Sequence, residues 1–118
     1  MKNMKSKITF ILLSLLLTTF FAGCFLFPST NHSPTITSTE ITTATVGVVY
    51  TYDVDATDPD GDTLIYSLTI KPADMTIDSV TGVINWTPDT IGGYDVIVNV
   101  EDGTLNDIQS FIIKVSKS

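Results

Sequence analysis

The residues best suited to chemistry are three carboxylates, Asp58, Asp60 and Asp62, which lie close together in the otherwise uncharged stretch 56–64. Like charges at this spacing repel each other unless solvent or a cation lies between them. Hard cations such as Ca²⁺ prefer the oxygen ligands that these side chains offer. The same residues, Asp58-Pro59-Asp60-Gly61, also fit an ordinary solvated type I turn. The residues alone leave both interpretations open.

Other kinds of site find little support in the sequence. An EF-hand is excluded, because the sixth position from Asp58 is Thr63 instead of Gly and the twelfth is Thr69 instead of Glu. Nucleophilic catalysis needs a Ser or Cys beside a base, but the single Cys24 and the single His32 both precede the predicted domain. Phosphate-binding Gly loops and zinc-type Cys/His spacing are missing. We therefore expect no enzymatic activity.

Length and charge limit the architecture and the partners. The chain has 118 residues, enough for one small domain after its apolar start is set aside. It carries 6 Lys and Arg against 13 Asp and Glu, and three of the Lys precede the apolar run, so a processed chain has 3 − 13 = −10. Such a surface is repelled by nucleic acid, and we expect no nucleic-acid partner. A single Cys excludes an internal disulfide.

The first residues read as an export signal. A basic start is followed by the apolar run Ile8–Phe20, and Ala22-Gly23 stands directly before Cys24. This order resembles the lipobox of bacterial lipoproteins, in which the Cys is diacylated and becomes the new first residue. The resemblance implies a signal peptide over residues 1–23 and a lipid anchor on Cys24. The alternative is a retained helix, because Ile8–Phe27 is about long enough to cross a hydrocarbon core. In both cases the rest of the chain is exported.

Residues 24–33 are predicted to be the lipidated Cys24 and a flexible tether, and residues 34–118 a folded domain. Beyond Pro34 the chain is rich in strand-forming residues whose apolar side chains alternate. The alternating positions are Tyr50, Tyr52, Val54 and Ala56; Leu64, Tyr66, Leu68 and Ile70; Met75 and Ile77; Ile84 and Trp86; Tyr94, Val96, Val98 and Val100; Phe111, Ile113 and Val115. With Ile36 and Ile41 in the opening segment they predict about seven strands in an all-β Greek-key sandwich of the immunoglobulin or cadherin kind.

Several of these segments carry a family resemblance. The segments are Ala56-Thr-Asp-Pro-Asp-Gly-Asp-Thr-Leu, Thr81-Gly-Val-Ile-Asn-Trp-Thr-Pro and Tyr94-Asp-Val-Ile-Val-Asn-Val-Glu-Asp-Gly. They resemble the bacterial cadherin-like and Ig-like repeats related to the dystroglycan-type cadherin domain, and the match extends from about Asn31 to the end. The resemblance implies a surface or secreted module that acts in adhesion, spacing or carbohydrate association. It stands here as one copy, whereas such repeats usually occur in tandem.

Cadherins bind calcium at the end of the domain, and the resemblance carries that role to particular positions. It assigns Asp58 and Asp60 as paired ligands in the first loop, Asp62 as a further ligand, Asp102 as the carboxylate after a late strand and Asn31 as the linker ligand. The acidic pair of the cadherin mid-domain motif is absent after Trp86, so the implied site is incomplete. We expect weak Ca²⁺ binding, about 10⁻⁴ to 10⁻³ M, as in extracellular modules.

Four further positions have competing interpretations. Trp86 offers a stacking surface for a sugar, but its alternation with Ile84 also favours packing in the core. The alternation points Ile65, Ile97 and Ile112 outward, either as a patch for a partner or a neighbouring copy, or as scattered exposed residues.

Together these features predict a lipid-anchored module of the bacterial cell envelope that faces outside the cytoplasm. We expect it to bind or support a surface protein without catalysis. The alternative is a carbohydrate-binding module for a polysaccharide, or an accessory spacer of a surface complex.

Overall fold

The structure, a computed structural model, describes residues 29–118, which form strands and no helix. The chain divides into two units, residues 1–30 and 31–118, and all nine strands lie in the second. The strands are β1 (Thr35–Ile36), β2 (Thr43–Thr45), β3 (Tyr50–Asp53), β4 (Ala56–Thr57), β5 (Ile65–Ile70), β6 (Thr76–Ile77), β7 (Val83–Trp86), β8 (Gly92–Glu101) and β9 (Asn106–Ser116). The predicted all-β class is confirmed.

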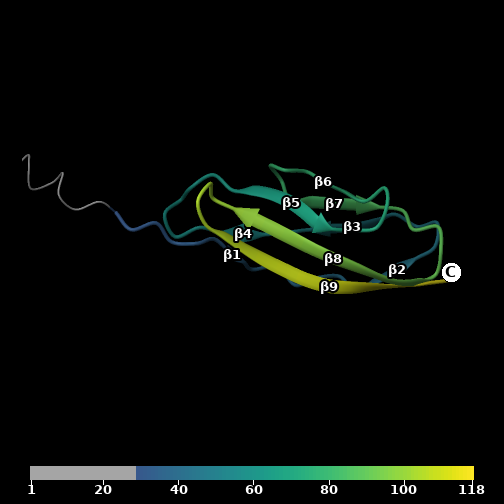
Figure 1. Ribbon diagram of the computed structural model, residues 1–118. Helices are drawn as coiled ribbons and strands as arrows, with labels where there is room; N and C mark the ends of the chain where they lie inside the picture. The colour runs from purple at the N-terminus through teal and green to yellow at the C-terminus, as the bar shows by residue number, and fades with distance from the viewer. Residues whose placement is uncertain (1–28) are drawn as a thin grey trace, which may run out of the picture. The chain divides into compact units, whose positions relative to one another are not determined.

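The strands form two layers that pack face to face (Figure 1). One layer is the four-stranded sheet β2-β9-β8-β5, and the other contains the three-stranded sheet β3-β7-β6 together with the pair β1-β4. All pairings are antiparallel except that of β2 with β9. The long β8-β9 hairpin therefore forms the centre of one layer and carries a turn at the end of the sandwich.

The sequence predicts about seven strands where the structure has nine, because two predicted strands are each divided. The opening segment first pairs as β1 with β4 and then crosses to the other layer, where β2 pairs with β9. The predicted strand 50–56 pairs with β7 as β3 and, after Asp53, continues as β4 beside β1. Period-two alternation continues from Tyr52 through Val54 to Ala56, so the sequence pattern does not reveal the second crossing. The first crossing interrupts the alternation, since Ile36 and Ile41 are five residues apart and Ile41 is 44 % exposed.

The core consists of the side chains for which the alternation predicts an inward direction. Tyr52, Val98 and Ile113 are at most 2 % exposed, and Trp86 stands edge-on to Tyr50 and to Tyr94. The buried set is Tyr50, Tyr52, Val54, Tyr66, Met75, Ile84, Trp86, Val96, Val98, Val100, Phe111, Ile113 and Val115. Both layers contribute, as a sandwich requires.

The prediction for Ile70 is wrong. The alternation places Ile70 on the inner face with Tyr66 and Leu68, but its side chain is 49 % exposed. The register of β5 against β8 shifts between Leu68 and Ile70, and Ile70 pairs with Ile97. A bulge inserts one residue into the strand and so reverses the side on which the following residues point. Ile70 therefore joins the outer face of the four-stranded sheet.

Candidate metal centre

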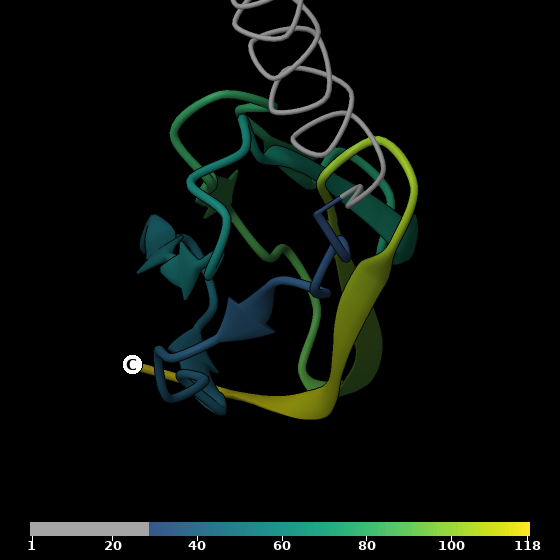
Figure 2. The same ribbon diagram turned by 90° about the vertical axis from the view of Figure 1, so that its left-hand side faces the viewer.

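Three segments that are distant in sequence meet at one end of the sandwich. The β4-β5 loop carries the acidic stretch, the β8-β9 turn carries Asp102, and residues 31–33 run beside both (Figure 2). The loop and the turn come together because β5 and β8 are paired neighbours, with Ile65 opposite Glu101. The topology of the sheet thus brings Asp102 to the acidic loop.

The acidic loop is a tight turn held by Asp58. Its carbonyl oxygen accepts a hydrogen bond from Gly61 N at 3.1 Å, and its Oδ1 accepts from Asp60 N at 2.8 Å and from Asp62 N at 3.4 Å. Gly61 has a φ of 71°, which suits a residue without a Cβ. The second carboxylate oxygen, Oδ2, is buried and has no hydrogen-bond partner among the described residues. A buried polar oxygen without a partner is costly, so this atom is a candidate to bind a ligand or a water molecule.

The β8-β9 turn holds its own carboxylate in the ionised form. Asp102 Oδ1 accepts hydrogen bonds from Leu105 N at 2.8 Å and from Thr104 N at 2.9 Å. These bonds, with that of Leu105 the stronger influence, lower the pKa of Asp102 to about 2. Asp102 is therefore an anion at neutral pH.

Asp58, Asp62 and Asp102 converge. Each places one carboxylate oxygen so that the three atoms lie within 4.8 Å of one another. Desolvation first, and then the charges of Asp58, Asp60 and Asp102, raise the pKa of Asp62. No Lys or Arg forms an ion pair with the cluster within residues 29–118. The negative charge is thus left to a proton, to solvent or to a cation.

The other two predicted ligands contact neighbouring groups. The Asn31 side chain donates through Nδ2 to Asp102 Oδ2 at 3.0 Å and to Thr104 Oγ1 at 2.7 Å. Asp60 lies outside the converging group, because its Oδ2 accepts from His32 N at 2.6 Å and its Oδ1 lies 3.2 Å from His32 Nδ1. The backbone bond from His32 is the main cause that lowers the pKa of Asp60.

The contact between His32 and Asp60 is one that the sequence did not predict. The two residues are 28 positions apart, and His32 lies in the segment predicted to be a flexible tether. Its side chain is largely exposed, but its backbone and ring contact Asp60 of the acidic loop. Nothing local in the sequence signals this contact, since it depends on where the sandwich places the loop.

The three converging carboxylates fit a calcium ion. Ca²⁺ binds oxygens at 2.3–2.6 Å, so two ligand oxygens of one ion lie at most about 5 Å apart. The separation of the three oxygens satisfies that limit. The unpartnered Asp58 Oδ2 would gain its missing partner. Three carboxylates supply fewer than the six to eight oxygens that Ca²⁺ takes, and backbone carbonyls, water or the Asn31 amide oxygen would have to complete the shell.

The structure does not support sugar stacking on Trp86. The indole is 5 % exposed and lies between Tyr50, at a ring distance of 6.3 Å, and Tyr94, at 4.9 Å. A sugar needs a free aromatic face, and this ring has none. The alternative interpretation, that Trp86 belongs to the core, is the one that its burial supports.

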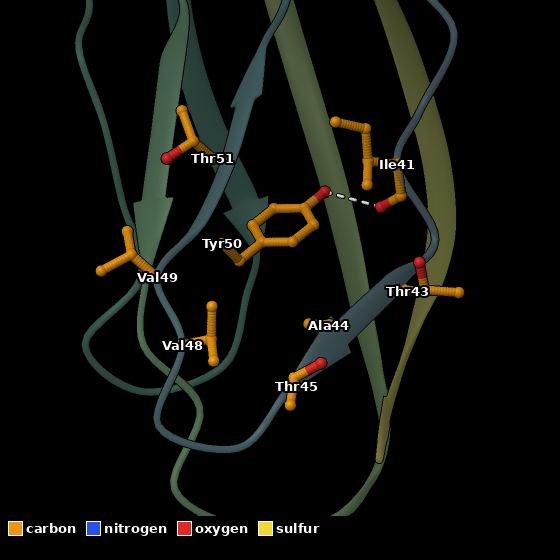
Figure 3. A pocket seen from close by; sticks show the side chains of 8 residues that line it. All are labelled: Ile41, Thr43, Ala44, Thr45, Val48, Val49, Tyr50 and Thr51. Carbon is orange, nitrogen blue, oxygen red and sulfur yellow. Dashed lines mark hydrogen bonds between the residues drawn. The ribbon is translucent and has the colours of Figure 1, made fainter. Parts of the chain in front are cut away.

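A pocket of about 260 Å³ opens between β2 and β3 (Figure 3). It is lined by Thr and aliphatic side chains, and no charged residue contributes to it. Its floor is held by Tyr50, whose hydroxyl donates to the carbonyl oxygen of Ile41 at 2.7 Å. Burial raises the pKa of Tyr50, so the phenol remains a donor. The pocket offers no group for catalysis or for binding an ion.

The predicted signal peptide and the lipid anchor on Cys24 lie outside the described residues. Within residues 29–118, no helix has the length and apolar character needed to cross a bilayer.

Solved structures with the same fold come from several kinds of protein. A putative alpha-galactosidase from Bacteroides fragilis has a TM-score of 0.62 at 19% sequence identity, over 70% of this chain and 17% of its own. Human protocadherin-24 EC1-2 has a TM-score of 0.56 at 18% identity, over 74% and 44%. The SrpA adhesin of Streptococcus sanguinis has 0.56 at 17%, over 75% and 58%. This chain thus spans less than two thirds of each, and the likeness concerns the fold.

Comparison of the sequence with known proteins and domain families identifies its family. No curated protein matches the chain. Residues 33–116, which include all nine strands, match one domain family. This match, together with the cadherin and adhesin folds above, confirms the predicted cadherin-like and Ig-like resemblance. The chain belongs to the family described as the Putative Ig domain.

Proposed function

We propose that this chain is an exported, membrane-anchored Ig-like module that binds or supports a surface partner without catalysis, and that calcium stiffens one end of it. The observation that carries the calcium proposal is the convergence of one carboxylate oxygen each from Asp58, Asp62 and Asp102, and the unpartnered Oδ2 of Asp58 supports it. The membership in an Ig-like family, and the likeness to a cadherin and an adhesin, support the general role.

The proposed role of the ion is to connect three segments. Asp58 and Asp62 belong to the acidic loop and Asp102 to the β8-β9 turn, so one ion bound to all three ties the loop to the turn. Asn31 already contacts Asp102 through Nδ2, and a half-turn of its amide would present its oxygen to the same side. Calcium would therefore also fix the segment that enters the domain.

Thermal unfolding of the purified chain tests this proposal. Millimolar Ca²⁺ should raise the Tm, because a ligand that binds only the folded state stabilises it. Asp58→Asn and Asp102→Asn should each abolish the shift.

Asp78→Asn is the matched control. Asp78 Oδ1 accepts hydrogen bonds from Val80 N at 2.8 Å and Thr81 N at 2.9 Å, much as Asp58 Oδ1 holds its own loop, but Asp78 belongs to no carboxylate cluster of the described residues. The Asp78→Asn chain should keep the full calcium shift. An unchanged Tm in the parent chain with calcium, or an equal loss in the control, contradicts the proposal.

The membrane anchor has its own test. If Cys24 is lipidated, cells grown with labelled palmitate should yield a labelled chain, and Cys24→Ser should remove the label. A parent chain that stays in the membrane fraction without label indicates a retained helix instead.

A second candidate is an accessory spacer in a carbohydrate-active assembly, which the likeness to a putative alpha-galactosidase favours. Within residues 29–118 no aromatic side chain is among the exposed large apolar ones, so we propose support of a partner enzyme instead of direct sugar stacking. Affinity purification of the intact chain should then recover a glycoside hydrolase, and the chain alone should not co-sediment with insoluble polysaccharide. Direct co-sedimentation contradicts the spacer role.

A further inference from the structure

The outer face of the four-stranded sheet is unusually rich in isoleucine. Ile65, Ile70, Ile108 and Ile112 are between 48 % and 58 % exposed, and Ile97 is half-buried among them. The outer face of the three-stranded sheet differs, because its exposed positions are polar. Examples are Thr51, Asp53, Thr76 and Asn85. We call the first surface the isoleucine face.

The isoleucines form one patch, because the strand register places four of them beside each other. Ile70 on β5 pairs directly with Ile97 on β8. Ile97 pairs with Ser110 on β9, so Ile108 and Ile112 are its diagonal neighbours on the same face. Direct and diagonal cross-strand neighbours lie within about 8 Å, which is within reach of such side chains. Their exposure is therefore contiguous, which is the kind that marks an interface.

The charged residues of this face are few, and two of the three lie at its opposite ends. Residues 29–118 contain three Lys and all 13 acids, a net charge of 3 − 13 = −10. The isoleucine face carries only Asp95, Glu101 and Lys114, a net charge of 1 − 2 = −1. Glu101 is four residues from Ile97 on β8, and Lys114 is four residues from Ser110 on β9 in the opposite direction. Glu101 and Lys114 are thus about 13 Å from the Ile97–Ser110 row, at about 3.3 Å per residue, whereas Asp95, two residues from Ile97, is about 7 Å from it.

We propose that the isoleucine face binds a second copy of this chain, face to face and with the strands running in opposite directions. The two-fold axis crosses the strands at the row of Ile97 and Ser110. In this arrangement Ile97 meets Ile97 of the second copy, and Ile112 meets Ile108. Such a contact is self-complementary, as a two-fold interface must be.

The charges select this arrangement over its alternative. Glu101 faces Gly93 of the second copy. Gly93 has no side chain, and within its own copy it pairs with Lys114 on the neighbouring strand. Each Glu101 therefore comes beside Lys114 of the other copy. If the strands of the two copies ran in the same direction, the ends of β8 that carry Glu101 would lie over each other, and the two Glu101 carboxylates would repel. Charge complementarity thus favours the opposed orientation.

The interface is small. Ten residues of β8 at about 3.3 Å each and four strands about 4.8 Å apart give roughly 500 Å² per copy. That size belongs to the weak class of specific interfaces. The contact does not include the acidic loop or the β8-β9 turn carboxylate, so it is independent of the metal centre.

Photo-crosslinking in the intact chain tests the contact, because it captures weak complexes. A benzophenone amino acid in place of Ser110, which lies on the proposed axis, should yield a crosslink from chain to chain. The same residue in place of Thr51, on the outer face of the other sheet, should not. Mass spectrometry identifies the crosslinked partner. A crosslink from position 110 only to a different protein, or none, overturns the proposal.

A charge reversal tests the orientation. Glu101→Lys and Lys114→Glu should each lower the crosslink yield at position 110, by roughly ten-fold, because each turns two attractive pairs into repulsive ones. The double variant Glu101→Lys/Lys114→Glu should restore the yield. These residues are exposed or at the edge of the face, so an unchanged Tm checks that each variant folds. A double variant no better than the single ones overturns the opposed arrangement.

Discussion

Gly82 is the position where one added methyl group should do most harm. Its φ is 79°, and a Cβ built on it would lie 2.5 Å from the carbonyl oxygen of Val54 and 3.0 Å from the ring of Tyr66. Val54 N donates to Gly82 O at 3.0 Å, so the two strands are held together at this point and cannot easily separate. The residue therefore needs both a left-handed backbone and the absence of a side chain.

The size of the effect follows from these two requirements. A left-handed backbone costs Ala about 1 to 2 kcal/mol relative to Gly, offset by about 0.4 to 1 kcal/mol from the lower entropy of the unfolded chain. The collision with backbone adds about 1 to 3 kcal/mol, as in overpacked cores. Gly82→Ala should thus lower the free energy of unfolding by about 3 kcal/mol. For a domain of this size the Tm should fall by roughly 12 to 24 °C.

Gly47→Ala is the control that separates the two costs. Gly47 has nearly the same φ, 77°, but nothing lies within 4 Å of its Cβ position. It should lose only the backbone cost, about 1 kcal/mol, and roughly 4 to 8 °C of Tm. Urea unfolding followed by circular dichroism measures both. If Gly82→Ala is no less stable than Gly47→Ala, the close contact with Val54 is not what excludes a side chain at position 82.

Three other substitutions have expected outcomes. Without calcium, Asp62→Asn should raise the Tm, because desolvation and the neighbouring acids raise the pKa of Asp62 and so destabilise its charged form. With calcium, the same substitution should reduce the Tm shift that calcium causes. A lower Tm of the variant in EDTA contradicts this prediction. The pKa of Asp102 is lowered to about 2, so the stability that its carboxylate contributes is present above about pH 4 and is lost as the pH falls toward 2. Asp102→Asn should therefore flatten the fall of the Tm between about pH 4 and pH 2. An unchanged slope of Tm against pH contradicts this prediction. Tyr52→Phe should lower the free energy of unfolding by about 1 to 2 kcal/mol in urea titrations. The reason is that the hydroxyl group and its hydrogen bonds to Ser38 Oγ at 2.7 Å and to Gln109 Oε1 at 2.8 Å are lost. An unchanged urea midpoint of unfolding contradicts this prediction.

The sequence was sufficient for the layers and the core because burial in a sandwich has a period of two. Tyr52, Val98 and Ile113 are inward in the pattern and buried in the structure. The turn at Asp58-Pro59-Asp60-Gly61 was equally readable, since each residue type suits its place in a type I turn. These features depend on residues that are close together in the sequence, so they can be predicted from the sequence alone.

The features that the sequence did not predict depend on contacts across the fold. Ile70 points outward because of a bulge in β5, and no residue type in that strand predicts the bulge. Asn31 bonds to Asp102, 71 positions away, and His32 to Asp60, 28 positions away. These contacts follow from the pairing of β5 with β8, which places the acidic loop and the β8-β9 turn at one end. The family resemblance suggested Asn31 and Asp102, whereas nothing suggested His32.

The contacts of Asp58 also bear on whether the acidic stretch is an ordinary turn or a metal site. Asp58 uses Oδ1 for the turn and leaves Oδ2 buried without a partner, so the turn does not compete with a cation for the same oxygen. Asp78 shows that a turn of this kind does not by itself make a site, because its Oδ1 bonds in the same way but no other carboxylates converge on it. The difference lies in Asp62, which belongs to the same loop as Asp58, and in Asp102, which the pairing of β5 with β8 brings to that loop. The turn therefore uses one oxygen of Asp58 and leaves the other without a protein partner, so the turn and a metal site are compatible interpretations of the acidic stretch.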